Sequence, residues 1–129
     1  MKFGYTMIWV DDVVKTVEFY EKAFGLVRRT IRDQNQFVWA EMETGNTTLA
    51  FSSTNEAQAL FPGGFYPNDP IQLPSLIQIS FITPDVATAY MRALGAGAKT
   101  LDAPKRQPWG QTIARVRDIN GVLVSLVSE

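Results

Sequence analysis

The sequence contains no cysteine and no histidine among its 129 residues. The absence of cysteine excludes disulfide bonds, thiolate catalysis and zinc ribbons, and it is consistent with a reducing compartment. The absence of histidine excludes serine–histidine triads, acid–base catalysis by imidazole and histidine-bound metal sites. These two absences narrow the possible chemistry more than any other feature of the composition.

The sequence also has no large excess of positive or negative charge and no long apolar run. The formal net charge is −1, so the composition gives no reason to expect a nucleic-acid partner. No apolar run is long enough to cross a membrane and no signal peptide is recognisable, so we expect a cytoplasmic protein without a membrane partner. The 46% of hydrophobic and 19% of charged residues are typical of one globular domain with a substantial core.

The most informative stretch lies near the C-terminus and predicts a β-hairpin. Residues 111–117 alternate between polar and apolar, and residues 122–127 are apolar and rich in valine, with Ser125 the single polar interruption. Between them Asn120-Gly121 can supply the positive φ angles of a tight hairpin turn. Trp109, in a Pro-Trp-Gly motif, places a large aromatic side chain beside this hairpin.

The same design occurs earlier in the chain, which indicates a duplicated βαβββ module. The first copy reads as a strand at 5–10, a helix at 13–24, a strand at 26–33 and a hairpin of 37–42 with 47–52. The second copy reads as a strand at 77–82, a helix from about Pro84 to Gly95 and Gly97, a strand near 99–103 and the closing hairpin. Asp12 is the expected N-cap of the first helix. Asp12-Val13 aligns with Asp85-Val86, and Gly45 aligns with Gly121.

Two such modules predict an α+β fold, in which a curved mixed β-sheet surrounds a cavity and the helices cover its outer face. Module 1 is expected at about 1–53 and module 2 at about 76–129. The segment 54–75 between them allows at most a short helix at 56–61, because its prolines and glycines exclude long regular structure. It still carries five large apolar residues: Phe61, Phe65, Tyr66, Ile71 and Leu73. They either patch the edge of the core or belong to a lid over a ligand cavity.

This arrangement resembles the vicinal-oxygen-chelate fold of glyoxalases, extradiol dioxygenases and bleomycin-resistance proteins. The residues that carry the resemblance are Ile8-Trp9-Val10-Asp11-Asp12, Phe19-Tyr20, Phe24-Gly25-Leu26, Ile79-Ser80-Phe81, Pro108-Trp109-Gly110 and Asp118-Ile119-Asn120-Gly121. The resemblance covers nearly the whole chain apart from residues 53–75. It specifies the fold better than the activity, because the family hosts many chemistries.

Enzymes of this family bind a divalent metal through His, Gln or Glu at four equivalent strand positions that face the cavity. The resemblance places these positions at Tyr5, Ala50, Gln78 and Ser125. Only Gln78 is an ordinary ligand, whereas a catalytic divalent site needs about three protein ligands. We therefore expect no metal and no other cofactor. Gln78 then hydrogen-bonds either a ligand or a neighbouring side chain.

Strand alternation, anchored on those four positions, predicts which other side chains face the cavity. The predicted ligand-binding residues are Tyr5, Met7, Trp9, Phe37, Trp39, Glu41, Gln78, Ser80, Trp109, Gln111, Arg115 and Ser125. Residues of the opposite parity, such as Phe51 and Val124, are expected to pack against the helices. The aromatic rings suit a planar ligand, since stacking adds about 0.5–1.5 kcal/mol per pair. The alternative is that these rings belong to the core or to a dimer interface.

The leading hypothesis is a small-molecule binding protein that resembles the metal-free bleomycin-resistance branch. Such a protein forms a homodimer and sequesters a planar aromatic or peptide-type antibiotic or natural product. The alternative is a glyoxalase-like lyase, an isomerase or a dioxygenase of the same superfamily. A metal-free enzyme would use Glu41, with a pKa raised beside tryptophans, or Tyr5 as its acid–base group, although an ion pair with Arg115 would oppose this. A third hypothesis, an accessory protein of a biosynthetic pathway, differs from resistance only in its ligand.

Overall fold

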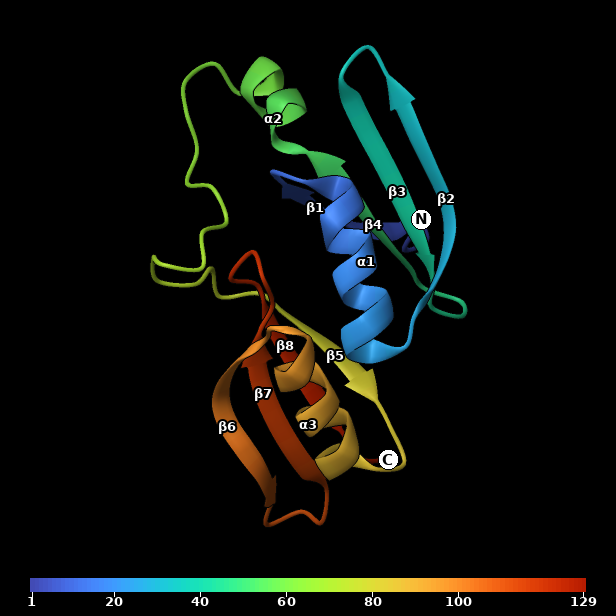
Figure 1. Cartoon of the computed structure of the whole chain (residues 1–129), viewed down its shortest axis with the longest axis vertical. Helices are drawn as coiled ribbons and strands as arrows, with labels where there is room; N and C mark the ends of the chain where they lie inside the picture. The colour runs from blue at the N-terminus through green and yellow to red at the C-terminus, as the bar shows by residue number, and fades with distance from the viewer. The chain divides into compact units, whose positions relative to one another are not determined.

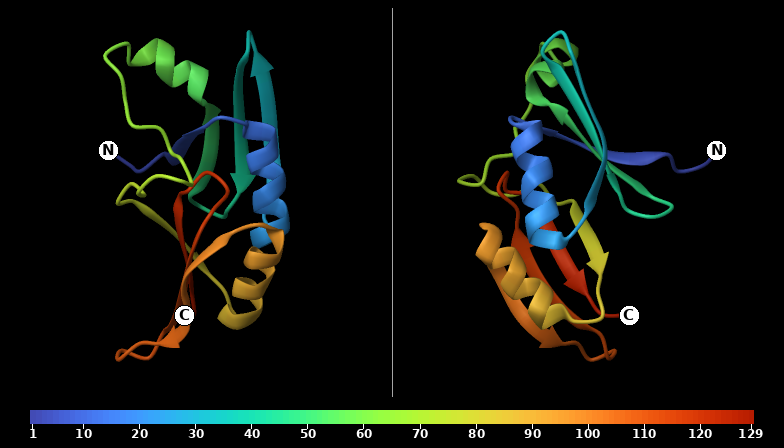
Figure 2. Two further views of the ribbon diagram at one scale, coloured as in Figure 1. Left: turned by 60° about the vertical axis from the view of Figure 1, so that its left-hand side comes forward. Right: turned by 45° about the vertical axis from the view of Figure 1, so that its right-hand side comes forward.

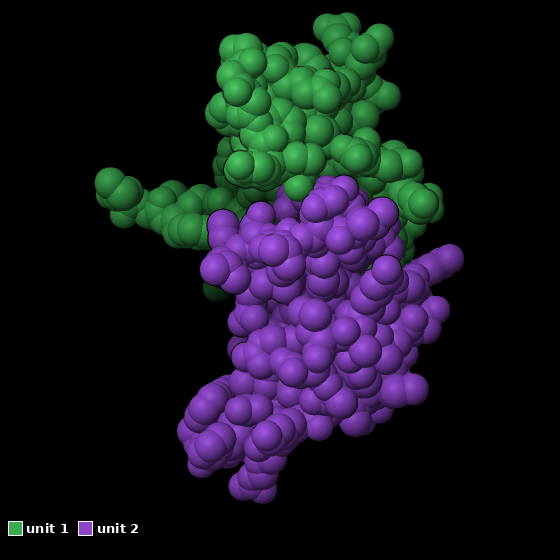
Figure 3. Space-filling model, turned by 90° about the vertical axis from the view of Figure 1, so that its left-hand side faces the viewer, with its two compact units in different colours: residues 1–21, 25–67 green, residues 22–24, 68–129 purple.

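The computed structural model describes residues 1–129, with three helices and eight strands. Contacts within the chain define two compact units, the first of residues 1–21 and 25–67 and the second of residues 22–24 and 68–129 (Figure 3). Each unit contains a four-stranded mixed sheet, so the prediction of an α+β fold built from two βαβββ modules is confirmed. None of the helices is long and apolar enough to span a membrane.

The first unit orders its strands β1-β4-β3-β2, with β1 parallel to β4 and the other pairs antiparallel. Its elements are β1 (Tyr5–Val10), α1 (Val13–Phe24), β2 (Val27–Gln34), β3 (Phe37–Glu43), β4 (Thr48–Ser53) and α2 (Thr54–Leu60). In Figure 1, α1 runs along one face of this sheet. Tyr20 of α1 is fully buried and contacts Phe51 of β4, with ring centroids 4.9 Å apart. Phe51 therefore faces the helix, as alternation predicts.

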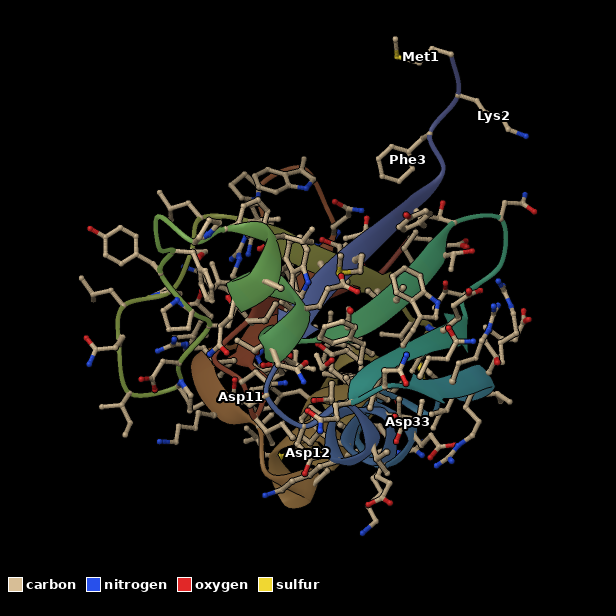
Figure 4. All side chains as sticks on the ribbon, turned by 90° about the horizontal axis from the view of Figure 1, so that it is seen from above. Met1, Lys2, Phe3, Asp11, Asp12 and Asp33 are labelled. Atoms are coloured by element: carbon tan, nitrogen blue, oxygen red, sulfur yellow. The ribbon has the colours of Figure 1, made fainter.

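The termini of α1 follow the sequence signals. Asp12 caps the helix, because its carboxylate Oδ1 accepts a hydrogen bond of 3.0 Å from the backbone N–H of Lys15. Figure 4 shows Asp11 and Asp12 where β1 passes into α1. Gly25 ends the helix in the left-handed conformation, with φ 68°. Both predicted ends of this helix are confirmed.

The second unit repeats the pattern with the strand order β5-β8-β7-β6. Its elements are β5 (Gln78–Ile82), α3 (Val86–Ala96), β6 (Lys99–Arg106), β7 (Thr112–Arg117) and β8 (Leu123–Val127). α3 lies along one face of this sheet (Figure 2). Its buried residues Val86 and Tyr90 belong to the same apolar core as Val116, Val124 and Leu126.

Helix α3 differs from the prediction at both ends. Pro84 lies outside the helix, because Asp85 is the N-cap and its Oδ1 accepts a hydrogen bond of 3.0 Å from Thr88 N–H. Gly95 lies within the helix and does not end it. Gly97 is the C-cap, with φ 116°, since its backbone N–H reaches the carbonyls of the last turn. The predicted strand near 99–103 extends to Arg106, where it pairs with Thr112.

The turn between β7 and β8 needs only one positive φ, which corrects the prediction of two. Gly121 has φ 88°, whereas Asn120 is not in the left-handed region. The buried carboxylate of Asp118 holds the turn instead, because its Oδ1 accepts hydrogen bonds from the N–H groups of Asn120 at 2.8 Å and Val122 at 2.9 Å. This explains the Asp-Ile-Asn-Gly motif in physical terms.

The segment after α2 contains no helix or strand until β5, as its prolines and glycines predict. Tyr66, Ile71 and Leu73 are strongly exposed, so the interpretation that they patch the core edge is wrong for these three. Phe61 is different, since its ring packs edge-on against Trp9 with centroids 5.6 Å apart. A lid role for the segment stays a prediction.

Candidate functional site

Four residues form a row across the first sheet, on the face opposite to the one that Phe51 presents to α1. Trp9 of β1 pairs with Ser52 of β4, Ser52 pairs with Trp39 of β3, and Trp39 pairs with Arg32 of β2. Paired residues on neighbouring strands share a face, so these four side chains lie in sequence across the sheet. We call Trp9, Ser52, Trp39 and Arg32 the indole row. The structure places Trp9 and Trp39 on one face, as alternation predicts, and their role in binding stays a prediction.

The spacing of the row leaves room between the two indoles. Neighbouring strands are about 4.8 Å apart, so the backbones of β1 and β3 are separated by about 10 Å. The residue between them, Ser52, is small and only 1% exposed, so it forms a floor. A planar ring placed above Ser52 would lie between these two strands, about 5 Å from the backbone of each, with an indole-bearing strand on either side.

An open pocket of about 470 Å³ lies at this row in the first unit. Its volume falls within the range of about 300–1,000 Å³ that is typical of small-molecule sites. Its lining residues are Arg32, Gln34, Asn35, Phe37, Val38, Trp39, Glu41, Ser52 and Glu56. We call it the first-unit pocket. Three predicted site residues, Phe37, Trp39 and Glu41, are among these lining residues.

Tyr5 and Trp9 do not line the pocket, but each of them contacts a residue that does. The ring of Tyr5 packs edge-on against Trp39, with centroids 5.6 Å apart. Trp9 contacts Glu56 of the lining, because its indole Nε1 donates a hydrogen bond of 3.3 Å to Glu56 Oε1. These contacts fix the orientation of both indoles. Met7, also predicted for the site, shares the face but does not line the pocket.

The environment of Glu41 contradicts two expectations. Its ion pair is formed with Arg29 of β2 at 3.1 Å and not with Arg115. The pKa of Glu41 is lowered and not raised, because the Trp39 indole N–H donates to its Oε2 at 2.9 Å and Arg29 adds a second hydrogen bond. A carboxylate stabilised in its ionised form is a poor proton donor and a weak base at neutral pH.

Glu56 is a pocket residue that the sequence analysis missed. It lies in the first turn of α2, is half-buried and forms no ion pair. α2 follows β4 without a linker, so a residue four positions after Ser52 must lie near the end of the row. This spacing in the sequence could have identified Glu56 as a pocket residue. Arg32 was missed as well, because no face was assigned to the strand at 26–33.

The second unit brings four predicted site residues into one polar network. Ser125 Oγ donates to Ser80 Oγ at 2.7 Å, and Gln78 Nε2 donates to the same oxygen at 3.3 Å. Arg115 Nε donates to Gln78 Oε1 at 3.4 Å, and Arg115 also pairs with Asp102. Of the two alternatives for Gln78, the structure therefore shows hydrogen bonds to neighbouring side chains.

Trp109 and Gln111 form a separate pair in the second unit. Trp109 lies in the turn between β6 and β7 and is 66% exposed. Its indole Nε1 donates to Gln111 Oε1 at 2.9 Å, and Gln111 Nε2 donates to the carbonyl of Ser128 at 3.0 Å. No hydrogen bond joins this pair to the Gln78 network. Their contribution to a ligand site stays a prediction.

The four positions that hold a metal in the family do not fit a metal ion here. Ala50 has no donor atom, and the fully buried hydroxyl of Ser125 is bonded to Ser80. Gln78 is committed to Ser80 and Arg115, and Tyr5 packs against Trp39. No group of three or more Asp or Glu residues converges anywhere else in the chain. The donor set therefore offers fewer than the roughly three ligands that a catalytic divalent ion needs.

A second hollow of about 350 Å³ in the first unit suits an aromatic ligand less well. It lies at the start of α1 and is lined by Asp11, Asp12, Val13, Val14, Gln36, Val38, Ser53, Thr54, Asn55 and Gln58. None of these is aromatic, and Asp12 is already used as the helix cap. The first-unit pocket is therefore the better candidate site.

Comparison with known proteins gives a consistent family signal. The family model of the Glyoxalase/Bleomycin resistance protein/Dioxygenase superfamily matches residues 2–126. A search of curated proteins finds no match. Among solved structures, a glyoxalase-related enzyme from Fulvimarina pelagi is 17% identical with a TM-score of 0.80, over 100% of this chain and 88% of that chain.

Two further structures extend this similarity. A glyoxalase/bleomycin resistance protein/dioxygenase family enzyme from Burkholderia phytofirmans PsJN is 19% identical with a TM-score of 0.78, over 99% of this chain and 98% of that chain. A superfamily member from Sphaerobacter thermophilus DSM 20745 is 25% identical with a TM-score of 0.73, over 100% and 98%. The enzymes from Fulvimarina and Burkholderia, at such low identity, share the fold and support no statement about activity.

Proposed function

The chain belongs to the glyoxalase/bleomycin resistance protein/dioxygenase superfamily, and on that premise we propose that it binds a planar aromatic small molecule without changing it chemically. The ligand class is an antibiotic or natural product with flat rings, including peptide-type compounds with planar groups. Resistance by sequestration needs affinity and enough protein, and it needs no catalytic group.

The indole row is the observation that carries this proposal. Trp39 lines the pocket, and Trp9 lies on the same sheet face across the buried Ser52, so a planar ring above Ser52 has an indole-bearing strand on either side. The indole hydrogen bonds to Glu56 and Glu41 preorganise both rings before a ligand arrives. Preorganisation lowers the ordering cost of binding and therefore supports a tight complex.

An enzymatic role receives less support from the same residues. Ala50 has no donor atom, and Gln78 and Ser125 are bonded to neighbouring side chains, which argues against a metal-dependent glyoxalase-like lyase or dioxygenase. A metal-free isomerase would need Glu41 or Tyr5 as its acid–base group. The lowered pKa of Glu41 and the packing of Tyr5 on Trp39 both oppose that use.

We also propose that the protein is a homodimer. Each sheet ends in edge strands, β2 in the first and β6 in the second among them, and large apolar side chains such as Tyr66 and Leu73 are exposed. Open edges and apolar surface are commonly covered by association of identical chains. Analytical ultracentrifugation at micromolar concentration checks this, and a monomer would contradict it.

The test of the binding proposal uses metal-stripped protein and matched pairs of planar and saturated ring compounds. Planar members should raise the melting temperature in proportion to the logarithm of their concentration, and the saturated members should not. Mass spectrometry should recover each planar compound unchanged after long incubation. Conversion of a compound, or equal shifts from both members of each pair, would contradict the proposal.

A further inference from the structure

We propose that the first-unit pocket selects planar aromatic ligands that carry a protonated amine, and that Glu56 is the residue that recognises the amine. This inference rests on the proposed function, which it deepens by naming the charge of the ligand and the residue that reads it. Two carboxylates, those of Glu41 and Glu56, line the pocket.

The two carboxylates differ in how far their charge is already satisfied. Glu41 accepts hydrogen bonds from the Trp39 indole and from the Arg29 guanidinium, so its charge is neutralised within the protein. Glu56 accepts one long hydrogen bond of 3.3 Å, from the uncharged Trp9 indole, and has no ion pair. A half-buried carboxylate without a cation has unused acceptor capacity and favours a cationic partner.

The position of Glu56 lets one ligand use both the carboxylate and the rings. Its bond to Trp9 places the carboxylate at the β1 end of the indole row. A ring above Ser52 that carries an amine on this side would bring the amine to Glu56. The same amine would lie near the Trp9 ring, and indole is the best aromatic partner for a cation.

Arg32 is the cation that could oppose this preference. It lies at the other end of the indole row, on β2, three strands away from Trp9. Three strand spacings separate the backbones of β1 and β2 by about 14 Å, while the side chains of Arg32 and Glu56 both line the pocket. Arg32 is also exposed and therefore well solvated. The pocket is thus acidic at its β1 end, where Glu56 lies, and basic at its β2 end, where Arg32 lies.

Three acridines of similar shape and different charge test the inference. At neutral pH 9-aminoacridine is a cation, whose ring nitrogen holds the proton and whose exocyclic amino group shares the charge, whereas acridine is neutral and acridine-9-carboxylate is anionic. Calorimetric titration of the full chain should show 9-aminoacridine binding about tenfold tighter than acridine, as expected for a charge-assisted hydrogen bond in a partly exposed site. Acridine-9-carboxylate should bind more weakly than acridine.

Glu56→Gln should remove this preference by weakening 9-aminoacridine about tenfold while acridine stays within about twofold. Glu18→Gln is the matched control, because Glu18 is an exposed carboxylate on α1 outside the pocket lining. It should change neither affinity. Arg32→Gln should strengthen 9-aminoacridine, by less than about threefold, because Arg32 is exposed and screened.

The possible outcomes separate this inference from the proposed function. If all three acridines bind with equal affinity and Glu56→Gln changes nothing, the inference is overturned and the proposed function stands. If Glu56→Gln weakens 9-aminoacridine and acridine equally, Glu56 merely holds Trp9 in place, and the inference is also overturned. If none of the acridines binds, both fail. Should Glu56→Gln not fold, the wild-type preference for 9-aminoacridine must still shrink with added salt, and a salt-independent preference overturns the inference.

Discussion

Replacing Gly121 with alanine tests how the turn between β7 and β8 packs against Asp69 and Pro70 in the segment before β5. A Cβ at Gly121 would lie 2.6 Å from Arg117 Nη2 and 2.8 Å from the carbonyl oxygen of Asp69. Gly45, at the equivalent turn of the first unit, has a similar φ of +79°, yet nothing lies within 4 Å of its Cβ position. The two glycines therefore differ in crowding while they share the same backbone conformation.

The magnitude follows from this difference. Alanine in the left-handed region costs about 1–2 kcal/mol at either turn. At Gly121 the added methyl also displaces the Arg117 guanidinium, which donates to the carbonyls of Gly121 at 2.9 Å, Asp69 at 3.1 Å and Pro70 at 3.3 Å. Loss of one or two hydrogen bonds from a charged donor adds about 2–3 kcal/mol. We expect Gly45→Ala to cost about 1–2 and Gly121→Ala about 3–5 kcal/mol.

Urea unfolding monitored by circular dichroism gives both free energies. Arg117→Met serves as a second variant, because it removes the guanidinium without changing the turn, and it should cost about 2 kcal/mol. Limited proteolysis between residues 62 and 75 should speed up in Gly121→Ala and Arg117→Met but not in Gly45→Ala. Equal destabilisation by the two alanine substitutions would show that the contacts of Gly121 with Arg117 and Asp69 add nothing to the cost.

Three further predictions concern the first sheet and the metal. Gln36→Gly should stabilise the protein by about 0.5–1 kcal/mol in urea unfolding, because Gln36 has φ 72° in the β2–β3 turn; a loss of stability would contradict this. Glu41 has a lowered pKa in the folded state, so its stabilising effect is present above the unfolded value of about 4.3 and is lost as the pH falls through the folded value. The stability gap between wild type and Glu41→Gln should therefore be full at pH 7 and should close below about pH 4; a gap independent of pH would refute the assignment. Chelator should leave the melting temperature unchanged, and about one zinc, nickel, manganese or iron per chain by elemental analysis would overturn metal independence.

Strand alternation predicted the faces of the first sheet well, because a period of two is fixed by the pleat. Phe51 faces α1 and Ser52 faces the other way, and Trp9 and Trp39 follow from the same register. The N-cap Asp12 was also predictable, since a carboxylate before an amphipathic stretch satisfies free N–H groups. Such local signals need no knowledge of the tertiary contacts.

The charge pairs could not be predicted in the same way. The partner of Glu41 is Arg29, which lies at a register shift between Arg28 and Thr30 of β2. A bulge of this kind turns a side chain out of the regular alternation, and no residue pattern announces it. Glu56 was missed because alternation assigns strand residues only, whereas Glu56 reaches the pocket from a helix.

Trp9→Ala and Trp39→Ala test whether the indole row binds planar rings. Titration with 9-aminoacridine should quench tryptophan fluorescence in the wild type, and each substitution should lower the affinity by roughly 2–4 kcal/mol, which is about 30- to 1,000-fold. The folded fraction must be measured by circular dichroism in the same samples, because loss of a packed indole also costs stability. Full-strength binding by the folded fraction of both variants would show that the tryptophans serve packing alone and would contradict the account.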